Sequence, residues 1–196
     1  NTTAHDLNLS GSHFTDTFGM HDESHYTTAY DLAILMQYCM KDETFRKIAG
    51  SASCSIPATN KYGVRLYNST NELIIPNNKN YYQYLTAGKT GFTSQAGDCL
   101  VSCSYKDNLE LICVILGGKT VNGVSTRFTE SKTLYEYGYS NYFIKTLINK
   151  DSVADQIEIK NATKDTKNLD LLIDKDITAL VNNSENYDNL VPEINI

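Results

Sequence analysis

Three adjacent residues, Lys89, Thr90 and Gly91, form the part of this sequence best suited to chemistry on a substrate. A lysine cation and a threonine hydroxyl side by side can receive a carboxylate through charge-assisted hydrogen bonds, and a lysine can also take part in proton transfer. Glycine has no side chain, so an extended ligand can approach the backbone closely there. On a strand edge such a triplet could bind the carboxylate of an extended ligand, but three residues recur by chance and do not assign a function alone.

Histidine and cysteine are the other residue types that could carry chemistry. The histidines have no helix-face spacing and no matching acid or cysteine set, so we expect surface or loop-packing histidines instead of a metal site. The cysteines contain no Cys-x-x-Cys pair, which argues against a zinc or thioredoxin-like site. We expect most cysteines to be small buried hydrophobic residues. One disulfide is possible if the protein is exported. We expect no cofactor. These residues are His5, His13, His21, His25, Cys39, Cys54, Cys99, Cys103 and Cys113.

Several helices must position these residues. Thr28 and Asp31 have the spacing of a capping box. In that motif the Thr28 side chain accepts a hydrogen bond from the third helical N–H, and the Asp31 side chain accepts one from the backbone N–H of Thr28. We therefore interpret Asp31 as a cap residue and not as a catalytic acid. We expect a helix over residues 28–40, a short one near 43–48 and another over about 125–142. The apolar positions with helical spacing in the first are Leu32, Leu35, Met36 and Cys39.

An antiparallel hairpin is predicted over residues 99–116, because two apolar runs flank Lys106-Asp107-Asn108. The second run is apolar at successive positions, so we expect a central strand covered by helices on both faces. Shorter strands are expected at 53–56 and 73–75. The nearby tyrosines, Tyr81, Tyr82 and Tyr84, could line a ligand groove, but half-buried packing is the preferred interpretation.

Composition narrows the class of protein. The chain has 196 residues, of which 41% are hydrophobic and 20% are charged, as in ordinary globular domains. A net charge of −6 without a Lys/Arg stripe argues against nucleic-acid binding. The longest apolar run, 111–116, is far shorter than the about 20 residues of a membrane span. Because the sequence begins at Asn1 without a leader pattern, we expect it to begin inside a longer protein.

The region around the triplet resembles the serine D-alanyl-D-alanine carboxypeptidases, which are low-molecular-mass penicillin-binding proteins. Residues 87–101, Ala-Gly-Lys-Thr-Gly-Phe-Thr-Ser-Gln-Ala-Gly-Asp-Cys-Leu-Val, are the most similar segment. Further similar stretches are 7–20, 25–33, 68–73 and 114–118. Two departures are Asn8, where glycine is usual, and Phe18, where histidine is common. The resemblance covers roughly residues 1–146.

This resemblance implies an α+β fold for residues 1–147, with an antiparallel sheet flanked by helices as in the penicillin-binding protein and β-lactamase-like transpeptidases. Residues 148–196 would begin a small β-rich domain. The implied substrate is a peptidoglycan stem peptide ending in D-Ala-D-Ala, with β-lactam antibiotics as further ligands. The implied location is the cell envelope, on the outer side of the membrane.

The resemblance also assigns roles in the site. Lys89 would act in catalysis, and the substrate would be bound by Lys89, Thr90, Gly91 and Thr93. The N–H of Phe92 would be one of two donors that hold the oxyanion, the other belonging to the nucleophilic serine.

The motifs for that serine are not found in this sequence. The family requires Ser-x-x-Lys and then Ser-x-Asn upstream of the matching region. No lysine has a serine three positions before it, and threonine precedes Lys89 and Lys132 at that spacing. We interpret the two Ser-x-Asn triplets, 69–71 and 184–186, as chance matches because of their positions. We therefore expect an incomplete enzyme that is inactive without an N-terminal segment carrying both motifs.

Two alternatives stay open. A degenerate relative could bind peptidoglycan peptides without chemistry. A class A β-lactamase shares the Lys-Thr-Gly triplet but fits residues 28–33 and 96–101 poorly. An isolated half of such a fold would expose part of its core, so we expect poor solubility or a partner segment.

Overall fold

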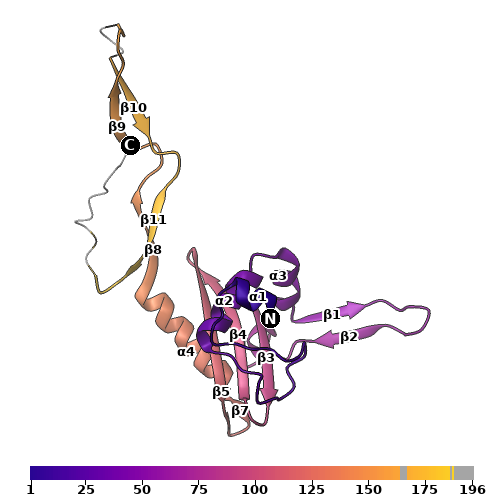
Figure 1. Cartoon of the computed structure of the whole chain (residues 1–196). Coiled ribbons are helices and arrows are strands. Elements are labelled where there is room, and N and C mark those ends of the chain that lie inside the picture. The colour runs from indigo at the N-terminus through magenta and orange to yellow at the C-terminus, as the bar shows by residue number, and fades with distance from the viewer. Residues whose placement is uncertain (164–166, 186, 188–196) are drawn as a thin grey trace. The chain divides into compact units, whose positions relative to one another are not determined.

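The computed structural model describes residues 1–163, 167–185 and 187, and the chain divides into two compact units, Asn1–Gly138 and Tyr139–Ile196 (Figure 1). The first unit mixes helices with antiparallel strands, which confirms the predicted α+β class. In the described part of the chain, no helix is long and apolar enough to cross a membrane.

A three-stranded antiparallel sheet carries the Lys-Thr-Gly triplet. Its strands are β3 (Leu85–Thr93), β4 (Gly97–Lys106) and β5 (Leu109–Gly118), in the order β3-β4-β5. The predicted hairpin is confirmed as β4–β5. Asp107 and Asn108 form its two-residue turn with φ of 50° and 63°, a conformation that Asp and Asn tolerate better than most residues. The triplet lies in β3, an edge strand whose only strand partner among the described residues is β4.

The expectation that residues 109–116 form a central strand is wrong. The central strand is β4, and β5 lies at an edge of this sheet in the part of the chain that the structure describes. The other half of that expectation is confirmed, because helices cover both faces of β5. Ile112 packs against the cluster of Met36 and Met40 on one face, and Leu111 lies against Gly138 on the other.

Helix α2 (Ala29–Cys39) begins at the predicted cap. The Thr28 hydroxyl accepts a hydrogen bond from Asp31 N at 3.0 Å. Asp31 was predicted to accept a hydrogen bond from the Thr28 N–H. Its carboxylate instead accepts hydrogen bonds from Gly11 N at 2.9 Å and from Ser12 Oγ at 2.6 Å. Asp31 thus joins the helix start to the preceding loop, which sequence spacing does not reveal.

The remaining elements of the first unit surround this sheet. They are α1 (Thr2–Asp6), α3 (Glu43–Ala49), β1 (Ser53–Ile56), β2 (Arg65–Asn68), η1 (Glu72–Ile74), β6 (Thr120–Val121), β7 (Val124–Ser125) and α4 (Thr126–Asn141). The helices expected near 43–48 and 125–142 and the strand at 53–56 are confirmed. Strands β1 and β2 form a ribbon that projects from the sheet (Figure 1).

The strand expected at 73–75 is wrong, since η1 is a 3-10 turn at this point. The Asn71 side chain accepts from Leu73 N at 3.2 Å, which starts a turn where an extended chain was expected.

Helices pack on both faces of the sheet. Ala87 and Cys103, partners in the β3–β4 register, join Met36 and Met40 in a buried cluster on the α2 and α3 face. On the α4 face, Ser102 Oγ lies 2.7 Å from the Tyr135 hydroxyl, and the Tyr135 ring stacks on Tyr82 at 5.4 Å. Tyr82 therefore packs in the core, in line with the preferred interpretation of these tyrosines.

The second unit consists of paired strands in its described part. Strand β8 (Tyr142–Ile148) pairs with β11 (Ile177–Asn182), and β9 (Val153–Glu158) pairs with β10 (Asn168–Leu172), both antiparallel. The alternation of apolar residues after about residue 150 reflects these strands. The division at 147/148 into a catalytic portion and a β-rich domain stays a prediction.

Candidate functional site

The triplet lies along the outer edge of the sheet. In the β3–β4 register Lys89 pairs with Val101, and Gly91 pairs with Cys99. Successive side chains of a strand alternate between faces, so Lys89 and Gly91 share the face of α2 and α3, and Thr90 belongs to the α4 face. At this edge Lys89 is exposed, whereas Thr90 is buried.

A cavity of about 550 Å³ lies beside this edge. Gly88, Lys89 and Thr90 form its β3 wall. Apolar side chains of α3 and the β1–β2 ribbon form much of the rest, and the segment 68–71 supplies polar groups. The remaining lining residues are Phe45, Lys47, Ile48, Ala49, Ser51, Ser53, Cys54, Tyr67, Asn68, Ser69, Thr70 and Asn71.

The polar groups of the triplet are held by local contacts. Lys89 Nζ donates to the carbonyl oxygen of Thr90 at 2.5 Å. The Thr90 hydroxyl lies 2.5 Å from the Thr70 hydroxyl, and Thr90 is only 9% exposed. Thr70 therefore fixes the direction of the hydroxyl that is predicted to receive a carboxylate, a contact that sequence analysis did not assign.

Asn71 packs directly against β3. It is 2% exposed, and its side-chain oxygen caps η1. A Cβ placed on Gly88 would lie 2.5 Å from Asn71 Nδ2, so the absence of a side chain at position 88 is what admits the amide. That Nδ2 is buried and has no hydrogen-bond partner among the described residues.

Arg127 is a second cation at the triplet that sequence analysis missed. It lies in the first turn of α4, and its Nη1 donates to Gly91 O at 3.1 Å and to Cys99 O at 3.4 Å. Its side chain is 14% exposed. The contact spans 36 positions in the chain, and no local pattern around Arg127 indicates it.

Asp98 holds Arg127 in place. Asp98 Oδ1 lies 3.6 Å from Arg127 Nη1, and Oδ2 accepts from Ser125 Oγ at 2.7 Å and from Thr120 Oγ1 at 3.0 Å. The hydrogen bond from Ser125 is the main cause that lowers the pKa of the Asp98 carboxyl. Thr120 and Arg127 lower it further, while burial opposes the shift. Asp98 is therefore an anion that ties β4, the β6–β7 hairpin and α4 together.

The two remaining predicted site residues lie at the end of β3. Phe92 is 70% exposed. The Thr93 hydroxyl accepts from Ala96 N at 3.0 Å, which closes the turn into β4. The triplet, Phe92 and Thr93 thus form one continuous strand end.

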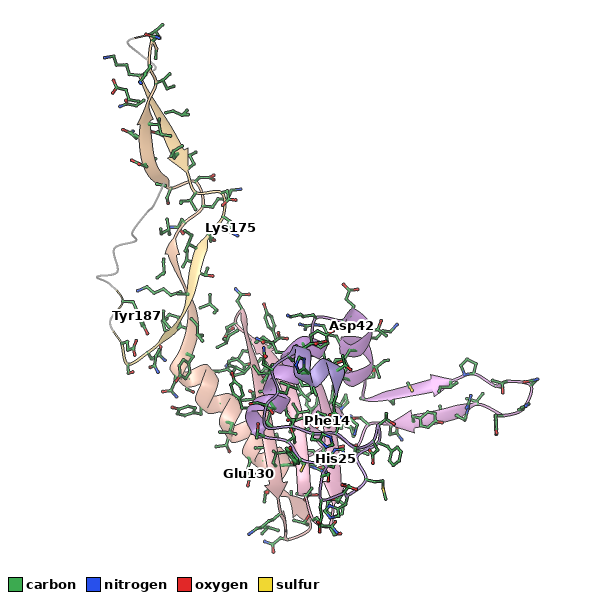
Figure 2. The ribbon with its side chains drawn as sticks, in the orientation of Figure 1. Phe14, His25, Asp42, Glu130, Lys175 and Tyr187 are labelled. Carbon is green, nitrogen blue, oxygen red and sulfur yellow. The ribbon has the colours of Figure 1, made fainter. Side chains whose placement is uncertain are left out.

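Two of the four histidines, His13 and His25, make loop contacts, while His5 and His21 are exposed. His13 Nδ1 lies 2.7 Å from Ser24 O, and His25 Nδ1 accepts from Thr15 N at 3.3 Å. The His25 ring meets the Phe14 ring edge to face, with the ring centroids 5.6 Å apart. Both residues are labelled in Figure 2. No group of three or more potential metal ligands occurs within residues 1–163, 167–185 and 187.

All five cysteines are free thiols. The expectation that most are fully buried is wrong, because only Cys103 and Cys113 are buried, and Cys54 is exposed beside the cavity. The strand β1 belongs to a projecting ribbon, so it offers Cys54 little cover. Burial raises the pKa of the Cys103 thiol to about 12.

Comparisons with known proteins agree on one family. A family model described as D-alanyl-D-alanine carboxypeptidase matches residues 1–120. The carboxypeptidase DacF of Bacillus subtilis is 26% identical over 194 residues, which are 99% of this chain and 47% of that protein. DacA of Haemophilus influenzae is 30% identical over 177 residues, 87% of this chain and 40% of that protein.

Solved structures show the same fold. A D-alanyl-D-alanine carboxypeptidase from Mycobacterium tuberculosis matches 71% of this chain and 51% of its own, with a TM-score of 0.62 and 25% identity. A regulatory factor of peptidoglycan synthesis from Streptococcus pneumoniae, PBP3, matches 98% of this chain and 56% of its own, with a TM-score of 0.73 and 16% identity. The chain spans about half the length of the curated relatives it matches.

Proposed function

Because the chain belongs to the D-alanyl-D-alanine carboxypeptidase family, we propose that it forms part of a serine-type enzyme that trims peptidoglycan stem peptides. The single observation that carries this proposal is the geometry of β3. The strand presents Lys89 and Thr90 at an edge that has no strand partner within the described residues, and the Arg127 guanidinium lies behind Gly91. An extended peptide can add to such an edge by backbone hydrogen bonds.

In the proposed reaction, the serine oxygen attacks the carbonyl carbon of the penultimate D-alanine. The bond to the terminal D-alanine breaks, that residue leaves with a proton, and water then hydrolyses the acyl-enzyme. The serine and its lysine base belong to a segment that carries Ser-x-x-Lys, a motif that this sequence does not contain.

The residues of this chain bind the substrate and stabilise charge. Lys89 and the Thr90 hydroxyl receive the terminal carboxylate, with the Arg127 cation nearby. Gly91 leaves the backbone open to the peptide, Thr93 borders it at the strand end, and the Phe92 N–H donates to the oxyanion that forms during attack. A fixed donor there is effective because it needs no reorganisation when the charge develops.

Two further proposals follow from the family. The enzyme acts at the outer side of the cell membrane, where peptidoglycan lies, and it is acylated by β-lactams. Residues 148–196 begin a β-rich C-terminal domain that follows the catalytic portion.

Intact mass after incubation with excess benzylpenicillin tests this proposal. We expect no adduct on the chain alone, and one adduct when the chain is joined to a serine-bearing N-terminal segment that carries Ser-x-x-Lys and Ser-x-Asn. Lys89→Ala or Thr90→Val in the joined protein should slow adduct formation. An adduct on residues 1–196 alone would mean that they contain the nucleophile. A well-folded joined protein without any adduct would favour a peptide-binding module.

A further inference from the structure

The peptide bond between Gly91 and Phe92 has an unusual partner. Its carbonyl oxygen, Gly91 O, accepts a hydrogen bond from Arg127 Nη1 at 3.1 Å. The same nitrogen contacts Cys99 O at 3.4 Å, and Cys99 is the register partner of Gly91 on β4. One nitrogen reaches both carbonyl oxygens because Gly91 O points toward β4.

This orientation determines where the N–H of Phe92 points. In a trans peptide the C=O and N–H groups lie on opposite sides of the chain, and the chain has no cis peptide among its described residues. The N–H of Phe92 therefore points away from β4, to the open edge of β3. It is the N–H of the same peptide group whose oxygen Arg127 holds.

A cation at the oxygen of a peptide strengthens the N–H at its other end. Hydrogen bonds to charged donors are roughly twice as strong as neutral ones, and linked hydrogen bonds polarise one another by about 10–30% per bond. Arg127 thus draws electron density toward Gly91 O and makes the Phe92 N–H a better donor to a negatively charged atom.

Asp98 keeps the guanidinium at this oxygen. Asp98 is 7% exposed, and two hydroxyls, those of Thr120 and Ser125, fix its carboxylate. Arg127 Nε is buried and has no hydrogen-bond partner in the described part of the chain. Nη1 makes the polar contacts with Gly91, Cys99 and Asp98, and the guanidinium carbon lies 4.8 Å from the centroid of the Phe128 ring.

We propose that Arg127 and Asp98 are positioning residues for the Gly91–Phe92 peptide, with Arg127 orienting and polarising the N–H that faces the reacting carbonyl. This inference rests on the proposed function, in which that N–H holds the oxyanion. Neither residue needs to touch the reacting atoms for this role.

The polarisation is tested on the chain itself by NMR with ¹⁵N and ¹³C labels. Arg127→Met should move the Phe92 amide proton and the Gly91 carbonyl carbon upfield, and Arg127→Lys should restore part of both shifts. The matched control is Arg46→Met, which removes an arginine that pairs with Glu110 at 3.1 Å on the same sheet. Unchanged Phe92 and Gly91 signals in a folded Arg127→Met variant would overturn the inference.

A second variant covers the case in which Arg127→Met does not fold. Asp98→Asn keeps the size of the side chain and removes its charge, so the guanidinium loses its anchor. We expect the same two signals to shift in the same direction by a smaller amount. Equal shifts of amides throughout β4 and β5 would indicate a general change of packing and would contradict the inference.

Acylation kinetics separate this inference from the proposed function. In the protein joined to the serine-bearing segment, Asp98→Asn should slow the maximal acylation rate by benzylpenicillin about tenfold with little change in half-saturation. That loss is smaller than the ~10²–10³ lost when an oxyanion donor is removed, because the donor is weakened but kept. An unchanged rate would overturn the positioning role of Asp98. If Lys89→Ala and Thr90→Val also had no effect, the proposed site itself would be wrong, whatever the NMR result.

Discussion

Two glycines of β3 differ in what surrounds them. A Cβ on Gly88 would lie 2.5 Å from Asn71 Nδ2 and 3.2 Å from Ser102 Cβ, whereas a Cβ on Gly91 would meet only Cys99 Cβ, at 3.7 Å. Gly88 is therefore required by packing. Packing does not require glycine at position 91, so the space beside Gly91 is available to a ligand.

Gly88→Ala should lower the free energy of unfolding by about 1–3 kcal/mol, the usual cost of adding a methyl group to a packed site. Gly91→Ala is the matched control and should cost less than about 0.5 kcal/mol, as at an uncrowded position. Urea denaturation followed by circular dichroism measures both. Equal losses for the two variants would contradict the packing described for Asn71.

The buried thiols give the stability of the chain a pH dependence. Burial raises the pKa of Cys103 from 9.0 to about 12 and also raises that of Cys113. An unfolded thiol ionises at lower pH than the folded one, so unfolding releases a proton and stability falls as pH rises above about 9. Cys103→Ala should reduce this slope in urea denaturation series between pH 8 and pH 11, whereas Cys54→Ala, at an exposed position, should leave it unchanged. Identical slopes in all three proteins would contradict the burial of Cys103.

At the scale of elements, the start of α2 shows how one carboxylate links a helix to a loop. Thr28 caps the helix, and Asp31 holds the backbone N–H of Gly11 and the hydroxyl of Ser12. The helix in turn supplies Met36 and Met40 to the cluster against Ala87 on β3. A weaker helix start therefore loosens the packing behind the Lys-Thr-Gly strand.

Thr28→Ala should lower the free energy of unfolding by about 1 kcal/mol, the typical value for a lost cap, and Thr28→Ser should recover most of it. Asp31→Ala should cost more, since it removes two hydrogen bonds from the loop in addition to a first-turn anion. Thermal or urea denaturation compares the three variants. A loss for Thr28→Ser as large as for Thr28→Ala would argue against the capping contact.

At the scale of the whole molecule, apolar side chains remain exposed on the first unit. The β1–β2 ribbon carries Tyr62, Val64 and Leu66, which are 64%, 64% and 76% exposed. Contiguous exposed apolar groups on a soluble chain favour association. We therefore expect self-association of the isolated chain that grows with concentration.

Sedimentation velocity over a range of concentrations measures this association. Leu66→Lys should shift the distribution toward monomer, because it places a charge on the exposed ribbon. Ser55→Lys is the matched control, since Ser55 is the register partner of Leu66 but removes no apolar surface. A strictly monomeric wild-type chain would contradict this prediction.

Local features were open to prediction because the contacts behind them are local. The cap at Thr28, the Asp107-Asn108 turn and the Lys-Thr-Gly triplet each depend on residues close together in the chain. The run of successive apolar residues at 111–116 likewise indicates a strand whose two faces are both covered. The sequence by itself thus determined the family, the main hairpin and the strand on which the site is proposed.

Tertiary structure decided what depends on distant partners. No local sequence signature indicates three features of the described residues. These are the edge position of β5, the 3-10 turn at Glu72–Ile74 and the packing of the Asn71 amide against Gly88. Arg127 reaches Gly91 across 36 positions because α4 begins beside the end of β3. A pattern of residue types records the period of an element but not the direction in which each peptide or guanidinium points, and only the packed chain brings those groups within hydrogen-bonding distance.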